Sequence, residues 1–549
     1  MDIQRIVLIG FSGTGKSSIG RQLALRLGWT AIDTDRAIEI AAFKTIPEIF
    51  ASDGETAFRD IERQVLLRSL DCATAVIATG GGAVIGEEVW TSDTLLASGT
   101  LTIALDSSPE VILNRLRSQQ AMSNETIERP LLATTDPLRR ITDLKRTRQP
   151  TYDRADLTLV TDSMSESDVV NQIASLVIKS SEPDVVLDAP GGRSKIYVRP
   201  GIVEQTGALV SAQWPRARQA FVITDANVGP LHGDRVRVSL ELAGLAVQTI
   251  TVPAGEGSKG WESAGSVIGT MLEGGIQRND VVVALGGGVI GDLAGFAAAV
   301  VLRGVGIVQI PTSLLAMVDS SVGGKTGVNH STGKNLIGAF YQPPLVLADP
   351  EILRTLPERE LTQGWAEVVK HAVIQPSTPD QFRSDIFGFL QRNRDHLVGL
   401  REPALTYAIR RNIALKASVV EADEREANLR AILNYGHTIG HAIEAAEYRY
   451  LHGEAISVGI HAANRIAALE GRIDVDRERE IGNLLSAFGL PGRASFDPDV
   501  VRERMKSDKK STAGRQTWVL PTGPNGVELT TGVGNESIDS ALDFVRSSE

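Results

Sequence analysis

The chain has 549 residues, enough for three or four domains of ordinary size. Its formal net charge of −11 argues against a nucleic-acid-binding surface, and its one cysteine, Cys72, excludes a disulfide framework and a thiolate metal cluster. The apolar stretch 281–302 contains five glycines and Asp292, which fits a strand, turn and helix better than a membrane span. We therefore predict a soluble, cytoplasmic protein that binds neither nucleic acid nor membrane.

The first 178 residues alternate between short apolar runs and helical periodicity. Such alternation predicts an α/β domain built as a three-layer parallel sheet. The predicted strands are 6–9, 75–78, 100–105 and 157–161, and the predicted helices are 17–27, 109–117 and 167–179. The polar segment 179–184 contains a proline and shows no periodicity, so we predict a linker there.

A phosphate-binding motif follows the first predicted strand. Residues 10–17 read Gly-Phe-Ser-Gly-Thr-Gly-Lys-Ser, which fits G-x-x-x-x-G-K-[ST] in full, and they open a helix. The glycines let backbone N–H groups surround phosphate oxygens, and the helix N-terminus favours negative charge. Lys16 would reach the terminal phosphates and Ser17 would ligate Mg²⁺. The residues expected to bind ATP are Gly13, Gly15, Lys16, Ser17 and Ser18.

Further features of this half, taken singly, are as readily turns or surface charges. They are Asp33 with Asp35, Arg59, the glycines 80–82, Arg129 in a polar stretch, and Arg148. In this order they resemble the shikimate kinase family over about residues 1–178. The resemblance implies that Asp33 helps to bind Mg²⁺, Asp35 binds the shikimate hydroxyls as candidate base, and Arg129 closes over the phosphoryl group. The expected substrate contacts are Arg59, Gly81, Gly82 and Arg148. A gluconate kinase is the rival interpretation.

The second half begins with another α/β pattern and then becomes helical. Strands are predicted at 220–224, 247–252, 281–285 and 306–310, and helices at 358–374, 404–421, 438–448 and 454–469. We place a Rossmann-like α/β subdomain at 185–349 and a mainly helical, metal-binding subdomain at 350–549. The glycines 286–288 lie at a strand-to-helix turn, where they could hold a pyrophosphate or serve only packing. Asp225 ends a strand, where an acid could bind a ribose hydroxyl.

A metal site is indicated by histidines, four of the eight falling between His437 and His461. His437 and His441 stand at i and i+4, on one face of a helix. His452 follows a short loop, and Glu367 lies on a separate predicted helix. Two histidines and one carboxylate with an open position describe a catalytic zinc site. Spacing alone would make His437 and His441 ligands together.

Residues 185–549 resemble the 3-dehydroquinate synthase family. The segments that carry the resemblance are 286–292, 311–315, 319–325, 333–335, 366–370, 434–441 and 452–454. The family implies zinc (or cobalt) on Glu367, His437 and His452, with His441 facing the substrate, a heptulosonate 7-phosphate. Other expected catalytic residues are Asp319, Lys325, Lys370, Lys416, Arg430 and Asn434. Asn335 and either Lys509 or Lys510 would bind the phosphate end.

The same resemblance implies a bound NAD and a homodimer. The residues expected at NAD are Asp225, Asn227, Glu256, Lys259, Gly287, Gly288, Asp292, Thr312, Ser313, Lys334 and Thr355. Arg303 is expected to reach the phosphate in the partner subunit's site. Two alternatives remain open: the second half is another sugar phosphate cyclase, or one half is a degenerate domain kept for binding or assembly.

Overall fold

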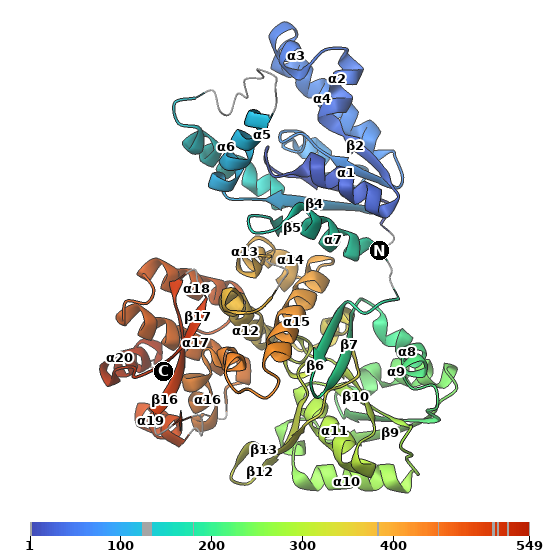
Figure 1. Ribbon diagram of the computed structural model, residues 1–549, viewed down its shortest axis with the longest axis vertical. Coiled ribbons are helices and arrows are strands. Elements are labelled where there is room, and N and C mark those ends of the chain that lie inside the picture. Colours follow the sequence, from blue (N-terminus) through green and yellow to red (C-terminus); the bar gives the residue numbers. More distant parts are fainter. Residues whose placement is uncertain are drawn as a thin grey trace. The chain divides into compact units, whose positions relative to one another are not determined.

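The computed structural model describes residues 3–122, 134–178, 181–380, 384–447, 449–507, 511–512, 515–523 and 526–547. The chain forms two compact units (Figure 1). One consists of Met1–Ser181 and Gln381–Ala404, and the other of Glu182–Asp380 and Leu405–Glu549. The first change of unit falls within the predicted linker. The return of residues 381–404 to the first unit was not predicted.

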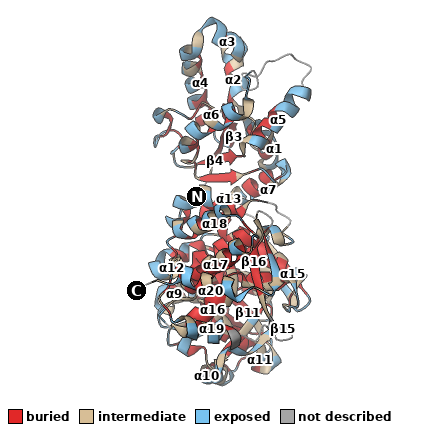
Figure 2. Ribbon diagram, turned by 90° about the vertical axis from the view of Figure 1, so that its left-hand side faces the viewer, coloured by how far each residue is buried: buried red, intermediate tan, exposed pale blue. Residues whose placement is uncertain are grey.

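The first unit contains a five-stranded parallel sheet in the order β2-β3-β1-β4-β5. These strands are β2 (Thr30–Asp33), β3 (Ala75–Ala78), β1 (Arg5–Ile9), β4 (Thr100–Asp106) and β5 (Leu157–Val160). Its helices are α1 (Lys16–Leu27), α2 (Thr34–Ala42), α3 (Ile46–Ser52), α4 (Gly54–Leu70), α5 (Pro109–Met122), α6 (Pro137–Tyr152), α7 (Glu166–Val177), α13 (Ile386–Arg392) and α14 (Arg394–Val398). β4 is almost wholly buried (Figure 2), as its apolar sequence requires when helices cover both faces of a parallel sheet.

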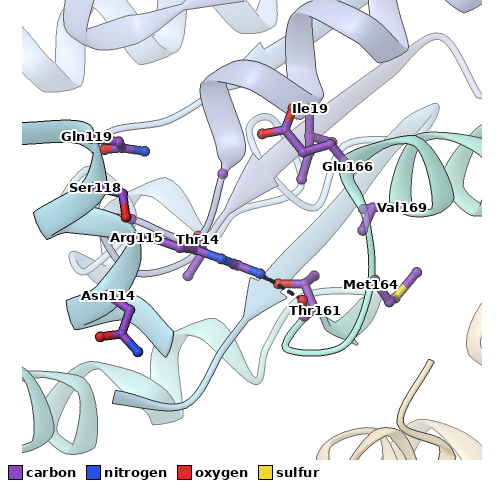
Figure 3. Close-up of a pocket in the computed structure, with 12 residues that line it drawn as sticks. Thr14, Ile19, Asn114, Arg115, Ser118, Gln119, Thr161, Met164, Glu166 and Val169 are labelled. Carbon is purple, nitrogen blue, oxygen red and sulfur yellow. Dashed lines mark hydrogen bonds between the residues drawn. The ribbon is translucent and has the colours of Figure 1, made fainter. Parts of the chain in front are cut away.

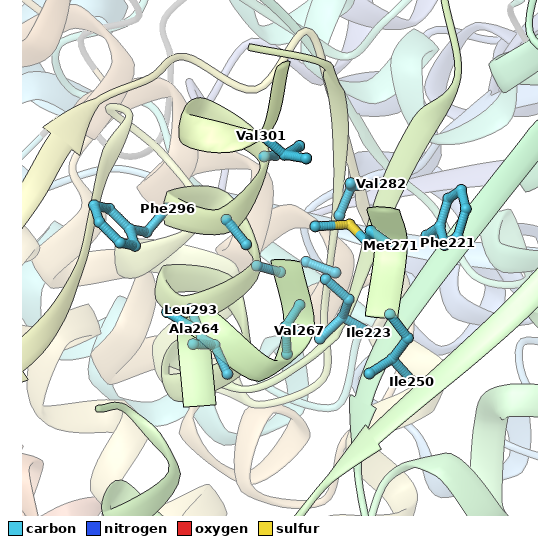
Figure 4. Close-up of a cluster of buried hydrophobic side chains, with 14 of the residues drawn as sticks. Phe221, Ile223, Ile250, Ala264, Val267, Met271, Val282, Leu293, Phe296 and Val301 are labelled. Carbon is cyan, nitrogen blue, oxygen red and sulfur yellow. The ribbon is translucent and has the colours of Figure 1, made fainter. Parts of the chain in front are cut away.

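The second unit begins with a seven-stranded sheet in the order β6-β7-β14-β11-β10-β8-β9, parallel except for β6. Its strands are β6 (Val185–Ala189), β7 (Gly192–Val198), β14 (Leu345–Ala348), β11 (Gly306–Pro311), β10 (Val281–Gly286), β8 (Gln219–Asp225) and β9 (Ala246–Val252). The helices of this part are α8 (Thr206–Gln213), α9 (Gly229–Leu242), α10 (Trp261–Glu273) and α11 (Gly288–Val300). Side chains such as Phe221, Val282, Met271 and Leu293 form one core between the sheet and α10 and α11 (Figure 4).

The rest of this unit is mainly helical, which confirms the predicted fold class. It comprises α12 (Glu358–Ile374), α15 (Ala404–Ala422), α16 (His437–Ala446), α17 (His452–Leu469), α18 (Val475–Ala487), α19 (Pro498–Ser507) and α20 (Asn535–Val545). The hairpin β12 (Lys325–His330) and β13 (Gly333–Phe340) and the strands β15 (Ser511–Thr512), β16 (Arg515–Pro521) and β17 (Val527–Thr531) were not predicted. Within the described ranges, no helix has the length and apolar character needed to cross a membrane.

Candidate active sites

The predicted phosphate-binding loop connects β1 to α1. Gly10 and Gly15 have φ of 133° and 92°, and a Cβ on Gly10 would lie 2.4 Å from the Leu105 carbonyl oxygen. These positions therefore need glycine. Lys16 Nζ donates to the carbonyl oxygens of Gly10 at 2.8 Å and Phe11 at 2.9 Å. The loop holds the lysine at the N-terminus of α1, where a phosphate would bind.

Two carboxylates act on this lysine. Burial lowers the pKa of Lys16 to about 8, although the charges of Asp35 and Asp33 oppose the change. Asp33 caps α2 by accepting from the backbone N–H groups of Asp35 at 3.1 Å and Arg36 at 3.4 Å. The Asp35 side chain is still accessible to solvent, but the surrounding protein removes part of its hydration and raises the pKa of its carboxyl. A carboxyl with a raised pKa is a suitable proton acceptor.

The glycines 80–82 bring the predicted substrate residues together. Arg148 Nη1 donates to the carbonyl oxygen of the second glycine at 3.3 Å. A Cβ on the first glycine would lie 2.6 Å from Asp35 Oδ1, and one on the third would lie 2.4 Å from Arg59 Nη1. Any larger residue would therefore displace a carboxylate or a guanidinium. Asp35 and the two arginines surround one small site, as a hydroxylated carboxylic acid would require.

Glu62 is a member of this site that the sequence reasoning missed. Its side chain is 5% exposed and accepts from Arg59 Nη1 at 2.5 Å. Burial raises the pKa of Glu62, against the opposing effect of Arg59. The spacing of three residues from Arg59 along α4 was the available signal, because i and i+3 side chains meet on a helix. Tyr152 also contributes, donating to the Gly81 carbonyl oxygen at 2.5 Å.

A cavity of about 400 Å³ adjoins the phosphate-binding loop (Figure 3). Its walls are Gly13–Gly15, the α5 residues Asn114 and Arg115, and residues between Thr161 and Val169. Arg115 is fixed, since Nη2 donates to the Thr161 carbonyl oxygen at 2.8 Å and Nη1 to Ser107 Oγ at 3.0 Å. The cavity is placed for the nucleoside end of a nucleotide. Nothing in the sequence pattern had singled out Asn114 or Arg115.

The predicted metal ligands converge in the second unit. Glu367 on α12 is fully buried, and its Oε1 lies 3.6 Å from His437 Nε2 and 3.6 Å from His452 Nε2. These distances exceed hydrogen-bond length, but they fit donor atoms that share one ion at about 2.0–2.1 Å. The residues present therefore fit a zinc-type ion.

Hydrogen bonds on the far side of each ring orient these two histidines. His437 Nδ1 lies 3.0 Å from the Tyr435 carbonyl oxygen, and His452 Nδ1 lies 3.0 Å from Glu444 Oε2. Each contact favours a proton on Nδ1, so that Nε2 is the nitrogen that would bind a metal. Burial lowers the pKa of His437 well below its usual value, so this ring is neutral. Glu444 was not predicted.

His441 lies within the same cluster, its ring centroid 4.9 Å from that of His437 and 5.6 Å from that of His452. Ring nitrogens of the three histidines lie within 4.8 Å of one another. The pair that spacing suggested, His437 and His441, is therefore close in space. So is the ligand set that the family resemblance implies, Glu367 with His437 and His452. His437 and His452 each place Nε2 3.6 Å from Glu367 Oε1 and have an acceptor at Nδ1, which suits both of them as ligands.

Buried cations surround the carboxylates beside the cluster. Lys370, on α12, is 1% exposed and forms an ion pair with Glu367. Lys416, on α15, donates to the Asp319 carboxylate at 2.5 Å and to its carbonyl oxygen at 2.6 Å. Burial would raise the pKa of Asp319, but Lys416 and Lys370 hold it below its usual value. Burial lowers the pKa of Lys416 to about 8. Arg430 is also buried, at 2% exposure.

The remaining predicted substrate residues sit at the rim. Lys325 forms an ion pair with Glu426, and Asn434 Nδ2 donates to the same carboxylate at 2.9 Å. Lys334, expected at NAD, lies 2.6 Å from Glu444 Oε1 and so belongs to the metal side of the site. The sequence reasoning did not predict Glu426. It also did not predict the contact of the buried His371, whose Nδ1 lies 3.1 Å from Asn412 Oδ1.

Most of the predicted NAD residues gather at the carboxyl ends of β8, β10 and β11, which are neighbours in the sheet. Asp225 accepts from the backbone N–H of Asn227 at 2.8 Å, and Lys259 lies 2.5 Å from Asp292. Gly287 caps α11, and a Cβ on Gly288 would lie 3.2 Å from Ser320 Oγ. Thr312 and Ser313 follow β11. Glu256 accepts a hydrogen bond from Asn329 Nδ2 at 2.7 Å. Thr355 Oγ1 lies 2.8 Å from His232 Nε2, with which it forms a hydrogen bond. A helix N-terminus at this edge suits a pyrophosphate.

The remaining predicted residues lie at the P-loop, on the surface of the second unit, or outside the described residues. Arg129, Lys509 and Lys510 lie outside the described residues. Ser17 is the second residue of α1, after Lys16, and Ser18 Oγ donates to the Gly15 carbonyl oxygen at 3.0 Å. Asn335 is exposed on β13. Arg303 is exposed at the end of the short 3-10 helix Val301–Arg303, between α11 and β11.

These arrangements define two classes of protein in one chain: a P-loop phosphotransferase and a dinucleotide-binding metalloenzyme. Family models match in the same order, shikimate kinase over residues 12–178, 3-dehydroquinate synthase N-terminal over 249–363 and 3-dehydroquinate synthase C-terminal over 364–511. The chain belongs to the 3-dehydroquinate synthase family and carries a shikimate kinase domain ahead of it.

Individual relatives agree. The 3-dehydroquinate synthase of Symbiobacterium thermophilum is 45% identical over 360 residues, covering 64% of this chain and 98% of that protein. That of Rhizobium etli is 44% identical over 338 residues, covering 60% and 88%. The solved structure of 2-epi-5-epi-valiolone synthase from Streptomyces hygroscopicus subsp. jinggangensis, with NAD⁺ and Zn²⁺ bound, is 29% identical with a TM-score of 0.58, covering 67% of this chain and 99% of that one.

Proposed function

We propose that the chain catalyses two reactions of aromatic biosynthesis. The first unit phosphorylates shikimate with ATP and Mg²⁺ to give shikimate 3-phosphate. The second cyclises 3-deoxy-D-arabino-heptulosonate 7-phosphate to 3-dehydroquinate and phosphate, with NAD and zinc or cobalt. The observation that supports the proposal is that, among the described residues, one unit carries the P-loop residues and the other brings Glu367, His437 and His452 together.

In the kinase, residues of the chain position the two substrates and neutralise their negative charges. The loop amides and Lys16 hold the phosphates, while Arg59 and Arg148 bind the carboxylate of shikimate. Asp35 accepts the proton of the attacking hydroxyl as its oxygen bonds to the terminal phosphorus and the bond to ADP breaks. The raised pKa of Asp35 makes this proton transfer easier.

In the synthase, bound NAD supplies reversible hydride transfer and the divalent ion supplies a Lewis acid. Glu367, His437 and His452 would hold the ion. Lys370, Lys416 and Arg430 neutralise the substrate carboxylate and developing negative charge. Lys325 would contact the phosphate that leaves, and His441 would exchange a proton with the substrate.

The decisive assay offers the whole chain its two substrates and their rivals. We expect ATP-dependent phosphorylation of shikimate but not gluconate, and NAD-dependent phosphate release from 3-deoxy-D-arabino-heptulosonate 7-phosphate. A different ketose phosphate, as another sugar phosphate cyclase would use, is the rival in the second arm. Turnover of that rival alone, or of gluconate alone, would reject the assignment of the respective half.

We further propose a cytoplasmic homodimer formed through the synthase half, with Arg303 reaching the partner's phosphate site. Arg303 and the preceding Leu302 have φ of 66° and 50°, which is strained for residues with side chains, and Arg303 is exposed. A test is subunit complementation. Mixing inactive Arg303→Ala with inactive His437→Ala should restore about a quarter of the activity after exchange, because one mixed site has both groups. No recovery in mixed dimers would refute the shared site.

A further inference from the structure

The segment Gln381–Ala404 connects two catalytic helices of the synthase yet belongs to the compact unit of the kinase. It lies in the sequence between α12, which carries Glu367, and α15, which carries Lys416. Its helices α13 and α14 have a buried apolar set, with Ile386, Phe389, Leu390 and Leu397 all at most 3% exposed. The segment is therefore a packed element of that unit.

Asn393, between the two helices, takes the place of a neighbouring strand at β5. β5 is the edge of the five-stranded sheet. Asn393 Oδ1 accepts from the Thr158 backbone N–H at 2.8 Å, and Nδ2 donates to the Thr158 carbonyl oxygen at 2.9 Å. Both residues are at most 1% exposed. One side-chain amide thus satisfies both polar groups of an edge residue that is closed off from water.

The buried carboxylate of Asp106 forms ion pairs with one residue of the kinase sequence and one residue of the segment. Asp106, at the end of β4, lies 2.8 Å from Lys145 Nζ and 3.0 Å from Arg392 Nε. Its side chain is 9% exposed. Lys145 comes from the kinase sequence and Arg392 from the segment. A carboxylate removed from water needs its cations, so the segment also stabilises this strand end.

Both contacts lead to the wall of the nucleotide cavity. Thr161 directly follows β5, lines the cavity and accepts from Arg115. Its backbone N–H donates to the Asp106 carbonyl oxygen at 2.8 Å. Asn393 holds the strand three residues before Thr161, and Arg392 holds the residue to which Thr161 bonds.

We propose that residues 384–404 are an internal docking element of the kinase, which holds the Thr161 wall so that ATP binding by the first half depends on the second half of the chain. The inference rests on the proposed kinase function for its activity readout. It adds to that function a regulatory link, because the element is continuous with the two helices that carry the synthase residues.

The test uses the full chain with Asn393→Asp, which keeps the shape but sets a carboxylate oxygen against the Thr158 carbonyl. We expect a KM for ATP raised about ten-fold, the size of a lost buried hydrogen bond, with KM for shikimate and synthase turnover within about two-fold. Hydrogen exchange over residues 157–165 should become faster. Arg392→Met should act in the same direction. Gln391→Ala, exposed on α13, is the matched control and should change neither.

The exchange measurement requires no turnover, so it separates this proposal from the kinase assignment. Loss of protection at 157–165 in Asn393→Asp supports docking even if the wild-type acceptor is not shikimate. Unchanged exchange together with an unchanged KM for ATP would overturn the proposal. An equal fall of both activities would also overturn it, since the segment would then support the chain as a whole rather than the nucleotide site.

Discussion

The two catalytic sites of this chain are built in opposite ways. The kinase site starts from one continuous stretch, residues 10–17, whose backbone amides bind phosphate and whose glycines permit the turn. The metal site gathers side chains from α12, α16 and α17, with its cations on α12 and α15. A backbone site depends on conformation, and a side-chain site depends on every member being present. Substitutions should therefore abolish the second more completely than the first.

Burial of the metal-site residues increases the expected difference between substitutions at the two sites. Glu367 and Lys370 are at most 1% exposed, so removing either leaves a charge without its partner in the interior. Lys16, by contrast, donates to two neutral carbonyl oxygens of the loop, so its removal does not leave a buried charge without its partner at these contacts. Variants of the metal site thus need a check of folding, whereas a P-loop variant is a cleaner probe of chemistry.

The largest expected effect is loss of the metal. His437→Ala removes one of the two rings that face Glu367 Oε1 at 3.6 Å, and phosphate release should fall to background with no bound zinc. His441→Ala should keep the metal and lose most activity. Metal analysis of the purified variants, beside a thermal melt, measures both. Zinc retained in the His437 variant but lost in the His441 variant would exchange their roles.

Next in size is the loss of the P-loop cation. Lys16→Ala should lower kinase turnover by roughly 10³-fold, because positioned charge supplies most of the stabilisation in phosphoryl transfer. The synthase rate of the same preparation should be unchanged and serves as an internal control for folding. A kinase rate within about ten-fold of wild type would mean that Lys16 does not reach the phosphates.

The same contrast explains what the sequence could predict. The P-loop and the strands around it were predicted because motif and periodicity are local in sequence. Glu367 was a candidate ligand from the residues themselves, whereas His452 replaced His441 in the ligand set only through resemblance, since helical spacing favoured His437 with His441. Glu62 and Glu444 were missed because an acid on a helix is ordinarily a solvated charge, and Glu426 was missed because it lies in a loop; only the fold brings these side chains into the sites. Residues 381–404 were assigned by sequence order, whereas packing on β5 decides where they lie.

A smaller effect should follow from the carboxylate behind His452. Glu444→Gln keeps the shape but gives His452 Nδ1 a weaker acceptor and releases Lys334 from its ion pair. Zinc affinity should fall about 10–100-fold, measured by competition with a chromogenic chelator. Glu447→Gln, near the end of the same helix, is the matched control and should bind zinc as wild type does. Equal affinities in the two variants would show that Glu444 does not orient the ligand.

The smallest expected effect is a pH dependence of stability and of nucleotide affinity that arises from Lys16. The pKa of Lys16 in the free chain is about 8, against a usual value of 10.5, so the folded state binds fewer protons than the unfolded state between these values. This group's contribution to stability therefore rises with pH across that window.

Nucleotide affinity should change with pH in the opposite direction. Phosphate oxygens favour the charged lysine, so above pH 8 binding must take up a proton, and affinity for Mg-ADP should fall by at most about ten-fold per pH unit. Below pH 8 the lysine is already charged and affinity should level off. Calorimetry at pH 9 in two buffers of different ionisation enthalpy detects the proton directly. Lys16→Arg, charged throughout, should show no such uptake, and identical proton uptake in both proteins would assign the titration to another group.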